Sequence, residues 1–342
     1  MSELAAVRRP DGTIVVEETP FEDNESADDV IVAVTSCGIC GSDLRSWRAA
    51  PSTAQARPGA GGHEVVGRLA ASGLRVVVDP SAVGTCGRCE ACQAGAHWFC
   101  SRRTATFSGG FATRVRAPRH ALHYVPAGLT DELAALAEPV ACGVHAVRHS
   151  WTAHSSGSLS GVDVAVIGAG ALGLGAVMAA QAEGARRVAV VARHDFQERA
   201  AASLRPTETV TEAAAPAELR RLRPALVIDA VGSTESAELA EQAVAWRGEV
   251  VDLGAAGVPR GGPRSSAHEH RFFHPVAYAG LGGVHDIDVA LALLERRAAA
   301  VSTWPLASYP LEEVDAAFRR AADRPSGVVR VLVEPDHGAT PP

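Results

Sequence analysis

The chain has 342 residues, of which 47% are hydrophobic and 21% are charged. This length exceeds the roughly 250–300 residues at which one hydrophobic core stops growing, so we expect two domains and exclude disorder as the main state. The net charge of −7 argues against nucleic acid or an anionic membrane as a partner. All 32 basic residues are arginines, so no lysine can serve as a Schiff base or general base.

The N-terminus carries no apolar run of signal-peptide length, and we expect a cytoplasmic protein that spans no membrane. The uncharged stretch between Asp163 and Glu183 contains four glycines, which a strand, a tight turn and a helix explain better than a membrane span. Thiols stay reduced in the cytoplasm, so clustered cysteines indicate metal binding or catalysis before disulfides.

Three regions differ in pattern. Residues 1–149 contain short β-type runs at 29–34 and 74–80, and 149–161 looks like a connector or the edge of the next domain. From residue 162 strands and helices alternate, which is typical of a parallel sheet covered by helices. We expect strands at 162–168, 186–192, 225–231, 248–254 and 328–335, and helices at 171–184, 197–204, 235–246 and 311–322.

The strongest motif is a run of four cysteines separated by two, two and seven residues. Four thiolates at these spacings can surround a zinc ion tetrahedrally, and all-cysteine sites are closed and therefore structural. An iron–sulfur cluster is the alternative on ligand type alone. The cysteines are Cys86, Cys89, Cys92 and Cys100.

A second group consists of Cys40, just past a predicted strand, and His63 with its neighbour Glu64. One thiolate and one imidazole make up half of a catalytic zinc site, which needs three protein ligands and an open position. Taken alone, a cysteine and a histidine of this kind can equally be structural.

A glycine loop follows the strand at 162–168 and opens the next helix, the context in which such a loop binds a dinucleotide. Its first glycine makes the turn, the second lets the backbone approach a pyrophosphate, and the helix N-terminus stabilises the negative charge. The alternative is a glycine-rich helix start that binds nothing. The residues are Gly168, Ala169, Gly170, Ala171, Leu172 and Gly173.

The residues that follow the expected strand at 186–192 indicate which nicotinamide cofactor is bound. A carboxylate that would accept from the ribose of NAD is missing there, and Arg193 with His194 follows instead. A guanidinium suits the 2′-phosphate of NADP, so we expect NADP(H) to be preferred over NAD(H). Arg193 can alternatively be solvated, and Asp195 can serve a ribose.

With these pieces together, the sequence resembles the zinc-dependent medium-chain alcohol and polyol dehydrogenases, in the branch of sorbitol and threonine dehydrogenases. The matching segments follow the family's order and are GICGSDL at 38–44, GGHEVVG at 61–67, the cysteines at 86–100, GGFATRV at 109–115, EPVACGVHAV at 138–147, VIGAGALG at 166–173 and DAVGST at 229–234.

The resemblance implies an α/β fold with two domains. One is a GroES-like, β-rich catalytic domain formed by residues 1–149 and 284–342. The other is a Rossmann domain at 150–283, with a doubly wound parallel sheet. We also expect a homodimer or homotetramer.

The resemblance also assigns roles to residues. Cys40, His63 and Glu138 would hold a catalytic zinc ion, and Cys86, Cys89, Cys92 and Cys100 a structural one, two Zn²⁺ per chain. Glu64 would be the carboxylate that binds the metal when water leaves, and Glu64 and Cys142 are the alternative third ligands. Ser42 would pass on the substrate proton, Asp43 would orient a ligand, and Val231 would contact the cofactor.

Two features depart from the family. Arg45 stands where the branch often has a histidine that relays the proton, and an arginine cannot act as a base. The stretch from His63 to Cys86 is also shorter than the family pattern. Cys37 and Cys142 are spare and are best explained as buried structural cysteines.

The resulting expectation is an enzyme that transfers a hydride between NADP(H) and a secondary alcohol, polyol or cyclitol-like substrate, or the matching ketone. The alternatives are a carbonyl or imine reductase on the same scaffold, and a non-catalytic protein that binds zinc and nucleotide. The histidine-rich segment at 267–274 can line the cofactor end of a cleft, form a subunit contact or be solvated. Residues that can line the substrate cleft are Trp47, Arg102 and Phe107.

Overall fold

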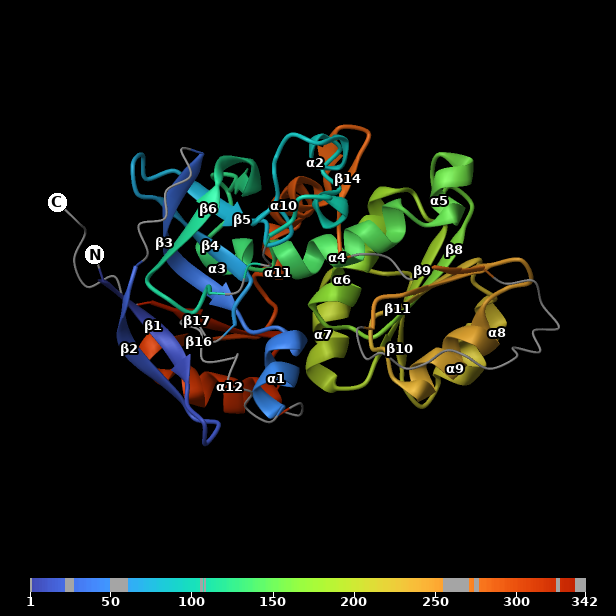
Figure 1. The fold of residues 1–342 in the computed structure, drawn as a ribbon. Helices are drawn as coiled ribbons and strands as arrows, with labels where there is room; N and C mark the ends of the chain where they lie inside the picture. Colours follow the sequence, from blue (N-terminus) through green and yellow to red (C-terminus); the bar gives the residue numbers. More distant parts are fainter. Residues whose placement is uncertain are drawn as a thin grey trace. The chain divides into compact units, whose positions relative to one another are not determined.

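The structure is a computed structural model that describes residues 2–21, 28–49, 61–104, 107, 109–254, 271–273, 277–323 and 327–335. The chain divides into two compact units, each of which we describe by itself (Figure 1). The first unit consists of Met1–Glu138 with Leu306–Pro342, and the second is Pro139–Pro305.

The first unit is built on a mixed sheet with the strand order β16-β17-β3-β4-β5-β7, and β6 pairs with β3. The C-terminal strand β17 pairs antiparallel with β3 from the N-terminal part, so distant chain segments lie side by side (Figure 1). A separate hairpin is formed by β1 and β2. The bounds are β1 Ser2–Arg8, β2 Ile14–Pro20, β3 Asp29–Gly38, β4 Glu64–Leu69, β5 Arg75–Val78, β6 Arg114–Pro118, β7 Leu122–Tyr124, β16 Leu306–Pro310 and β17 Arg330–Glu334.

The core of the first unit comes from alternating apolar residues of these strands. Val32 and Val34 on β3 are buried, and Phe318 packs against them from α12. The ring of Phe318 makes an edge contact with Phe111 at a centroid distance of 5.4 Å. The helices of this unit are short: α1 Gly41–Arg48, α2 Glu90–Gln93, α3 Asp131–Ala134 and α12 Val314–Ala322, with 3₁₀ turns at His97–Phe99, Arg119–Ala121 and Leu311–Glu313.

The second unit is built on a parallel sheet with the order β10-β9-β8-β11-β12-β13. Numbered from β8, this is the order 3-2-1-4-5-6 of a Rossmann fold, which binds ligands at the carboxyl ends of the strands where the order reverses. The bounds are β8 Asp163–Ile167, β9 Arg187–Ala192, β10 Glu208–Thr211, β11 Leu226–Asp229, β12 Glu249–Asp252 and β13 Arg271–Phe273, with a hairpin of β14 Gly280–Leu281 and β15 Val284–His285.

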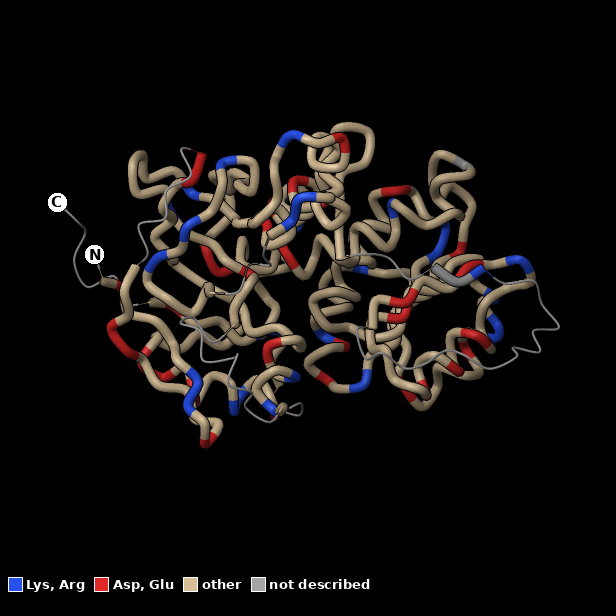
Figure 2. The backbone as a smooth tube through the Cα atoms, viewed as in Figure 1, with Lys and Arg blue, Asp and Glu red and all other residues tan. Residues whose placement is uncertain are grey.

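Helices connect these strands. Their bounds are α4 Ala137–Arg148, which begins in the first unit, α5 Trp151–Ser156, α6 Ala171–Ala182, α7 Asp195–Ser203, α8 Ala215–Leu222, α9 Thr234–Ala243, α10 Asp286–Arg296 and α11 Ala298–Val301. None of the helices in the described part of the chain is both long and apolar enough to cross a membrane. Acidic and basic residues are interspersed along both units (Figure 2).

The units divide at residues 138/139 and 305/306, whereas we expected crossings at 149 and 284. Packing explains the difference. α4 lies so close to α6 that a Cβ on Gly143 would be 2.2 Å from the carbonyl oxygen of Leu172. After α11, Trp304 Nε1 donates to Ser203 Oγ at 3.1 Å. The helices on both sides of the expected crossings therefore belong to the second unit.

The expected α/β fold class is confirmed, and the strands expected from residue 162 onward are present. The stretch 149–161 carries α5 instead of a plain connector, because Ser150 caps this helix by accepting from the N–H of Ala153. β10 and α8 were not expected, since the sequence ETVT of β10 is short and polar.

Candidate functional site

The four cysteines at 86–100 come together in the first unit. The Sγ–Sγ distances are 3.5 Å for Cys89 and Cys92, 3.7 Å for Cys86 and Cys100, and 4.0 Å for Cys86 and Cys92. A tetrahedral zinc site with Zn–S bonds near 2.3 Å has sulfur–sulfur edges of about 3.8 Å. The sulfurs are therefore too far apart for disulfides and are spaced as zinc requires.

Backbone amides prepare this cluster for a cation. Hydrogen bonds from the backbone N–H of Arg88 and of Cys89 lower the pKa of Cys86 to about 5. The N–H of Cys86 in turn donates to Cys100 Sγ at 3.5 Å, and this bond lowers the pKa of Cys100. Burial raises the pKa of Cys92 to about 11, whereas the backbone amides favour the thiolate form, which binds zinc, at Cys86 and Cys100.

The second cluster contains Cys40, His63 and Glu64, whose donor atoms all lie within 4.8 Å of one another. Cys40 caps the N-terminus of α1, directly after β3, and Glu64 begins β4 next to it in the sheet. Because β3 and β4 pair antiparallel, the sheet register brings the residues together. A thiolate, an imidazole and a carboxylate fit a catalytic zinc ion.

Asp43 ties the two halves of this cluster together. Its Oδ2 accepts from the N–H of Cys40 at 2.8 Å, and its Oδ1 accepts from the N–H of Gly62 at 3.1 Å. The same Oδ1 lies 3.8 Å from His63 Nδ1. Gly61 lets the carboxylate approach, since a Cβ there would be 2.7 Å from Asp43 Oδ1. Asp43 therefore fixes the backbone beside Cys40 and His63.

A buried arginine that the sequence did not point out supports the same cluster. Arg330 Nη1 donates to the carbonyl oxygen of Ile39 at 3.0 Å, and its Nη2 lies 3.2 Å from Glu64 Oε1. Gly38 makes room for Glu64, because a Cβ at that position would lie 2.0 Å from Glu64 Oε2. The only sequence signal for Arg330 is a charge that opens the apolar strand RVLVE.

Glu138 is buried and is not among the donors that lie within 4.8 Å of one another, but its charge acts on His63. Burial alone would lower the pKa of His63. The nearby side chains of Asp43 and Cys40 and the negative charge of Glu138 outweigh burial, so the pKa of His63 lies well above its usual range. Negative charge thus dominates the site, and a cation fits there.

The remaining residues are those suggested for the proton relay and the substrate cleft, together with two cysteines that have no assigned role. Ser42 is half-buried on the first turn of α1, whereas Arg45 is exposed. Trp47 is partly buried and packs against the core, where its Nε1 donates to the carbonyl oxygen of Gly12 and its ring lies near Phe318. Phe107 also packs against this core, and Arg102 is exposed. Cys37 and Cys142 are buried and take part in no disulfide bond.

The glycine loop has the geometry of a phosphate-binding turn in the second unit. Gly168 follows β8 with a φ of 100°, which favours glycine. A Cβ on Gly173 would lie 1.8 Å from the carbonyl oxygen of Gly168, so only glycine lets α6 start this close to β8. Gly170 caps α6, and a Cβ there would meet nothing within 4 Å. That open position lets a pyrophosphate approach, with Ala171 and Leu172 in the first turn behind it.

Arg193 follows β9 with a largely exposed side chain, and its Nε lies 3.4 Å from Glu212 Oε2. His194 caps α7 and stacks on Phe196 with a centroid distance of 5.6 Å. Asp195 is exposed on the first turn of α7. The end of β9 therefore presents the guanidinium of Arg193, a group suited to a 2′-phosphate, with the carboxylate of Glu212 beside it.

Val231 follows β11 and is half-exposed. It lies next to the glycine turn, since a Cβ on Gly168 would be 2.6 Å from Val231 Cγ2. Buried Asp229 shapes this loop by accepting from the N–H of Val231 and of Gly232, both at 3.0 Å.

Of the histidine-rich segment, the structure describes 271–273, which form β13; the rest lies outside the described residues.

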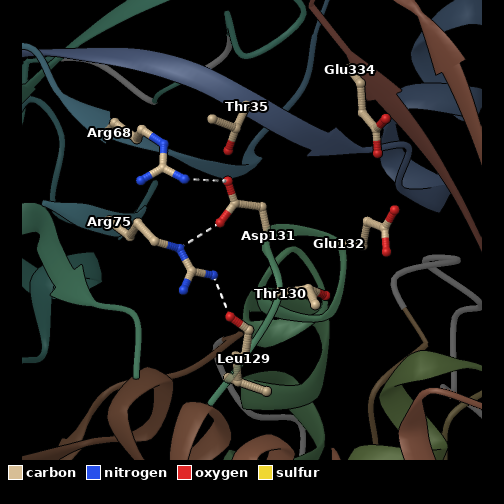
Figure 3. Close-up of a pocket in the computed structure, with 8 residues that line it drawn as sticks. All are labelled: Thr35, Arg68, Arg75, Leu129, Thr130, Asp131, Glu132 and Glu334. Atoms are coloured by element: carbon tan, nitrogen blue, oxygen red, sulfur yellow. Dashed lines mark hydrogen bonds and ion pairs between the residues drawn. The ribbon is translucent and has the colours of Figure 1, made fainter. Parts of the chain in front are cut away.

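A pocket of about 480 Å³ in the first unit is lined by other residues (Figure 3). Arg68 from β4 and Arg75 from β5 both point to Asp131 at the start of α3 (Figure 3). Arg75 Nε donates to Asp131 Oδ1 at 2.6 Å, whereas Arg68 Nη2 lies 3.8 Å from Oδ2. The pairing holds α3 on the sheet. The lining consists of Thr35, Arg68, Arg75, Leu129, Thr130, Asp131, Glu132 and Glu334.

Comparisons with known proteins agree with this arrangement. Residues 26–127 match the alcohol dehydrogenase GroES-like domain. The chain is 36% identical over 185 residues to an uncharacterised zinc-type alcohol dehydrogenase-like protein of Haemophilus influenzae, and 33% identical over 201 residues to a sorbitol dehydrogenase of Bacillus subtilis. These matches cover 50% and 54% of this chain and 51% and 54% of the relatives. The chain thus spans about half the length of the curated relatives it matches.

A solved structure extends the similarity over nearly all of the chain. It is a provisionally named zinc-binding dehydrogenase of Sinorhizobium meliloti bound to NADP, 27% identical, with a TM-score of 0.76 and coverage of 98% of this chain and 100% of that one. The fold and the two clusters define a zinc-type dehydrogenase scaffold. Residues 26–127 carry the alcohol dehydrogenase GroES-like domain, and over about half of its length the chain is similar to zinc-type alcohol and sorbitol dehydrogenases.

Proposed function

We propose that the protein is a zinc-dependent oxidoreductase that transfers a hydride between NADP(H) and a secondary alcohol, polyol or cyclitol-like substrate, or the matching ketone. The observation that carries the proposal is the positioning of Cys40 and His63 beside Asp43, with the carboxylate of Glu64 within 4.8 Å of both donor atoms. A sorbitol dehydrogenase among the relatives supports the polyol class.

In this proposal Cys40, His63 and Glu138 hold the catalytic zinc ion. Glu64 is a second carboxylate within reach of the same donors, and its charge is compensated by Arg330. Bound zinc supplies Lewis acidity, and the nicotinamide gives or accepts the hydride. Asp43 keeps the thiolate and the imidazole in place, which raises the affinity for the metal.

The substrate proton passes through Ser42, which lies on the first turn of α1 two residues after Cys40. A hydroxyl both donates and accepts, so it can take the proton and release it in the same step. Arg45 stays charged and cannot accept the proton. The proton therefore leaves from Ser42 to water.

A second zinc ion is bound by Cys86, Cys89, Cys92 and Cys100, which gives two ions per chain. Four thiolates leave no open coordination position, so this ion stabilises the fold and takes no part in the reaction. The near-tetrahedral spacing of the sulfurs supports this role.

The cofactor is bound by the second unit. The turn from Gly168 to Gly173 would hold the pyrophosphate, with Val231 beside it, and Arg193 with His194 would bind the 2′-phosphate. NADP in the Sinorhizobium meliloti structure supports a preference for NADP(H). We further infer a cytoplasmic homodimer or homotetramer that acts on small molecules, and the seven free cysteines support a reducing compartment.

The cofactor preference is tested by kcat/KM for NADPH and NADH in the wild type and in Arg193→Ala. A phosphate adds roughly −1.5 to −2 charges, so we expect a preference for NADPH above about tenfold, which needs only about 1.4 kcal/mol. The variant should lose most of that preference and keep its activity with NADH. Equal use of both cofactors by the wild type would contradict the assignment.

A further inference from the structure

Arg193 and Glu212 lie side by side at the carboxyl ends of two neighbouring strands. Arg193 follows β9 directly, and Glu212 follows β10, which pairs in parallel with β9. The N–H of Glu212 donates to the carbonyl oxygen of Ala192 at 3.0 Å, so sheet register fixes the two positions. The 3.4 Å contact between Arg193 Nε and Glu212 Oε2 therefore follows from the fold.

This ion pair can be exchanged for a ligand. The side chains of Arg193 and Glu212 are 70% and 61% exposed. Exposed pairs of this kind contribute little to stability, so the guanidinium can turn from the carboxylate to a phosphate. A phosphate monoester then competes for Arg193 with a carboxylate that stays in place beside it.

A second carboxylate adds to this negative surrounding. Glu235 lies in the first turn of α9, and its pKa is lowered by hydrogen bonds from its own backbone N–H and from Ser233 and by the charge of Arg193. Arg193 thus interacts with Glu212 by contact and with Glu235 at longer range. The positive charge expected from the sequence is partly neutralised in the structure.

We propose that Glu212 is a specificity-determining residue that limits the preference of this protein for NADP(H). It neutralises Arg193 and repels a 2′-phosphate, whereas NAD(H) has no phosphate there and leaves the ion pair intact. The inference rests on the proposed function, because it needs the adenosine end of the cofactor to lie at the end of β9.

Glu208 provides a matched control. It is the first residue of β10, four positions before Glu212, and its Oε1 lies 2.7 Å from Arg221 Nη2. Glu208→Gln and Glu212→Gln therefore remove the same charge from the two ends of β10. Only the second change removes it from the neighbourhood of Arg193, so any effect of net charge alone appears in both variants.

The experiment measures binding of adenosine 2′,5′-bisphosphate and of 5′-AMP by calorimetry to the full zinc-loaded chain, which needs no turnover. Glu212→Gln should bind the bisphosphate roughly two- to tenfold more tightly than the wild type, with 5′-AMP unchanged. The gain should shrink between about 0.1 M and about 1 M salt, where the Debye length falls from about 10 Å to about 3 Å. Glu208→Gln should behave as the wild type does.

The outcomes separate the two proposals. If the wild type prefers the bisphosphate but both glutamine variants respond equally, the role of Glu212 is wrong and the NADP(H) assignment stands. An equal gain for 5′-AMP in Glu212→Gln would also overturn its role in specificity. If the wild type binds both ligands equally and Arg193→Ala changes nothing, the assignment of NADP(H) fails, and this inference fails with it.

Discussion

Arg330 Nη2 lies 3.2 Å from Glu64 Oε1, and both side chains are buried. The C-terminal strand β17 thereby places its charge beside a carboxylate that begins β4. A buried pair adds little stability over an apolar pair, but removal of one partner costs about 3–5 kcal/mol because the other charge stays buried.

We therefore expect Arg330→Met to lower the free energy of unfolding of the zinc-loaded protein by about 3–5 kcal/mol, measured by urea denaturation. Arg330→Met combined with Glu64→Gln should recover part of the loss, since no charge is left unpaired. An unfolding midpoint for Arg330→Met equal to that of the wild type would show that the pair is not needed.

The two cysteine clusters should respond differently to the loss of one thiolate. Cys40→Ser should leave a folded protein with one zinc ion per chain and no activity. Cys89→Ser should lose the other ion and fold poorly, because structural sites contribute about 10–16 kcal/mol of binding free energy in small peptides. Cys142→Ser is the control and should keep both ions. Elemental analysis that finds a single zinc ion per chain in fully active wild type would contradict this scheme.

Glu138 and Glu64 can be separated as ligands. Glu138→Gln should weaken binding of the catalytic zinc ion by more than the about 10- to 100-fold expected for loss of a supporting group. Glu64→Gln should retain the ion but unfold more easily, because Arg330 then has no partner in the pair. Zinc content after dialysis against a weak chelator distinguishes them. Loss of zinc from Glu64→Gln alone would make Glu64 the third ligand instead.

Stability should also depend on pH through Glu3, far in the sequence from both clusters. Burial raises the pKa of Glu3 from 4.5 to about 7, against the opposing charge of Arg114. Because the folded state holds this proton more tightly than the unfolded state, the contribution is present below pH 4.5 and is lost as the pH rises to about 7.

Glu3→Gln should remove this dependence, so that the variant gains stability over the wild type as the pH rises between those values. The free energy of unfolding at a series of pH values measures the difference. Parallel profiles for the two proteins would show that Glu3 does not hold its proton in the fold.

The sequence predicted those parts of the molecule that depend on local pattern. The parallel strands are apolar and flanked by glycine, and the four cysteines have a spacing that few other structures require. Arg330 was missed because its partner Glu64 is distant in the chain and is reached only through the pairing of β17 with β3 and of β3 with β4. Glu212 was missed for the same reason, since the register of β9 and β10 brings it to Arg193.

The central claim is tested most directly by the oxidation or formation of NADPH, followed by absorbance, with a panel of ketones and polyols and zinc-loaded protein. We predict turnover of at least one secondary alcohol or its ketone by the wild type, and none above background by Cys40→Ser at the same concentration. A wild type that binds zinc and NADPH but turns over no member of the panel, or a Cys40→Ser variant as active as the wild type, would contradict the account.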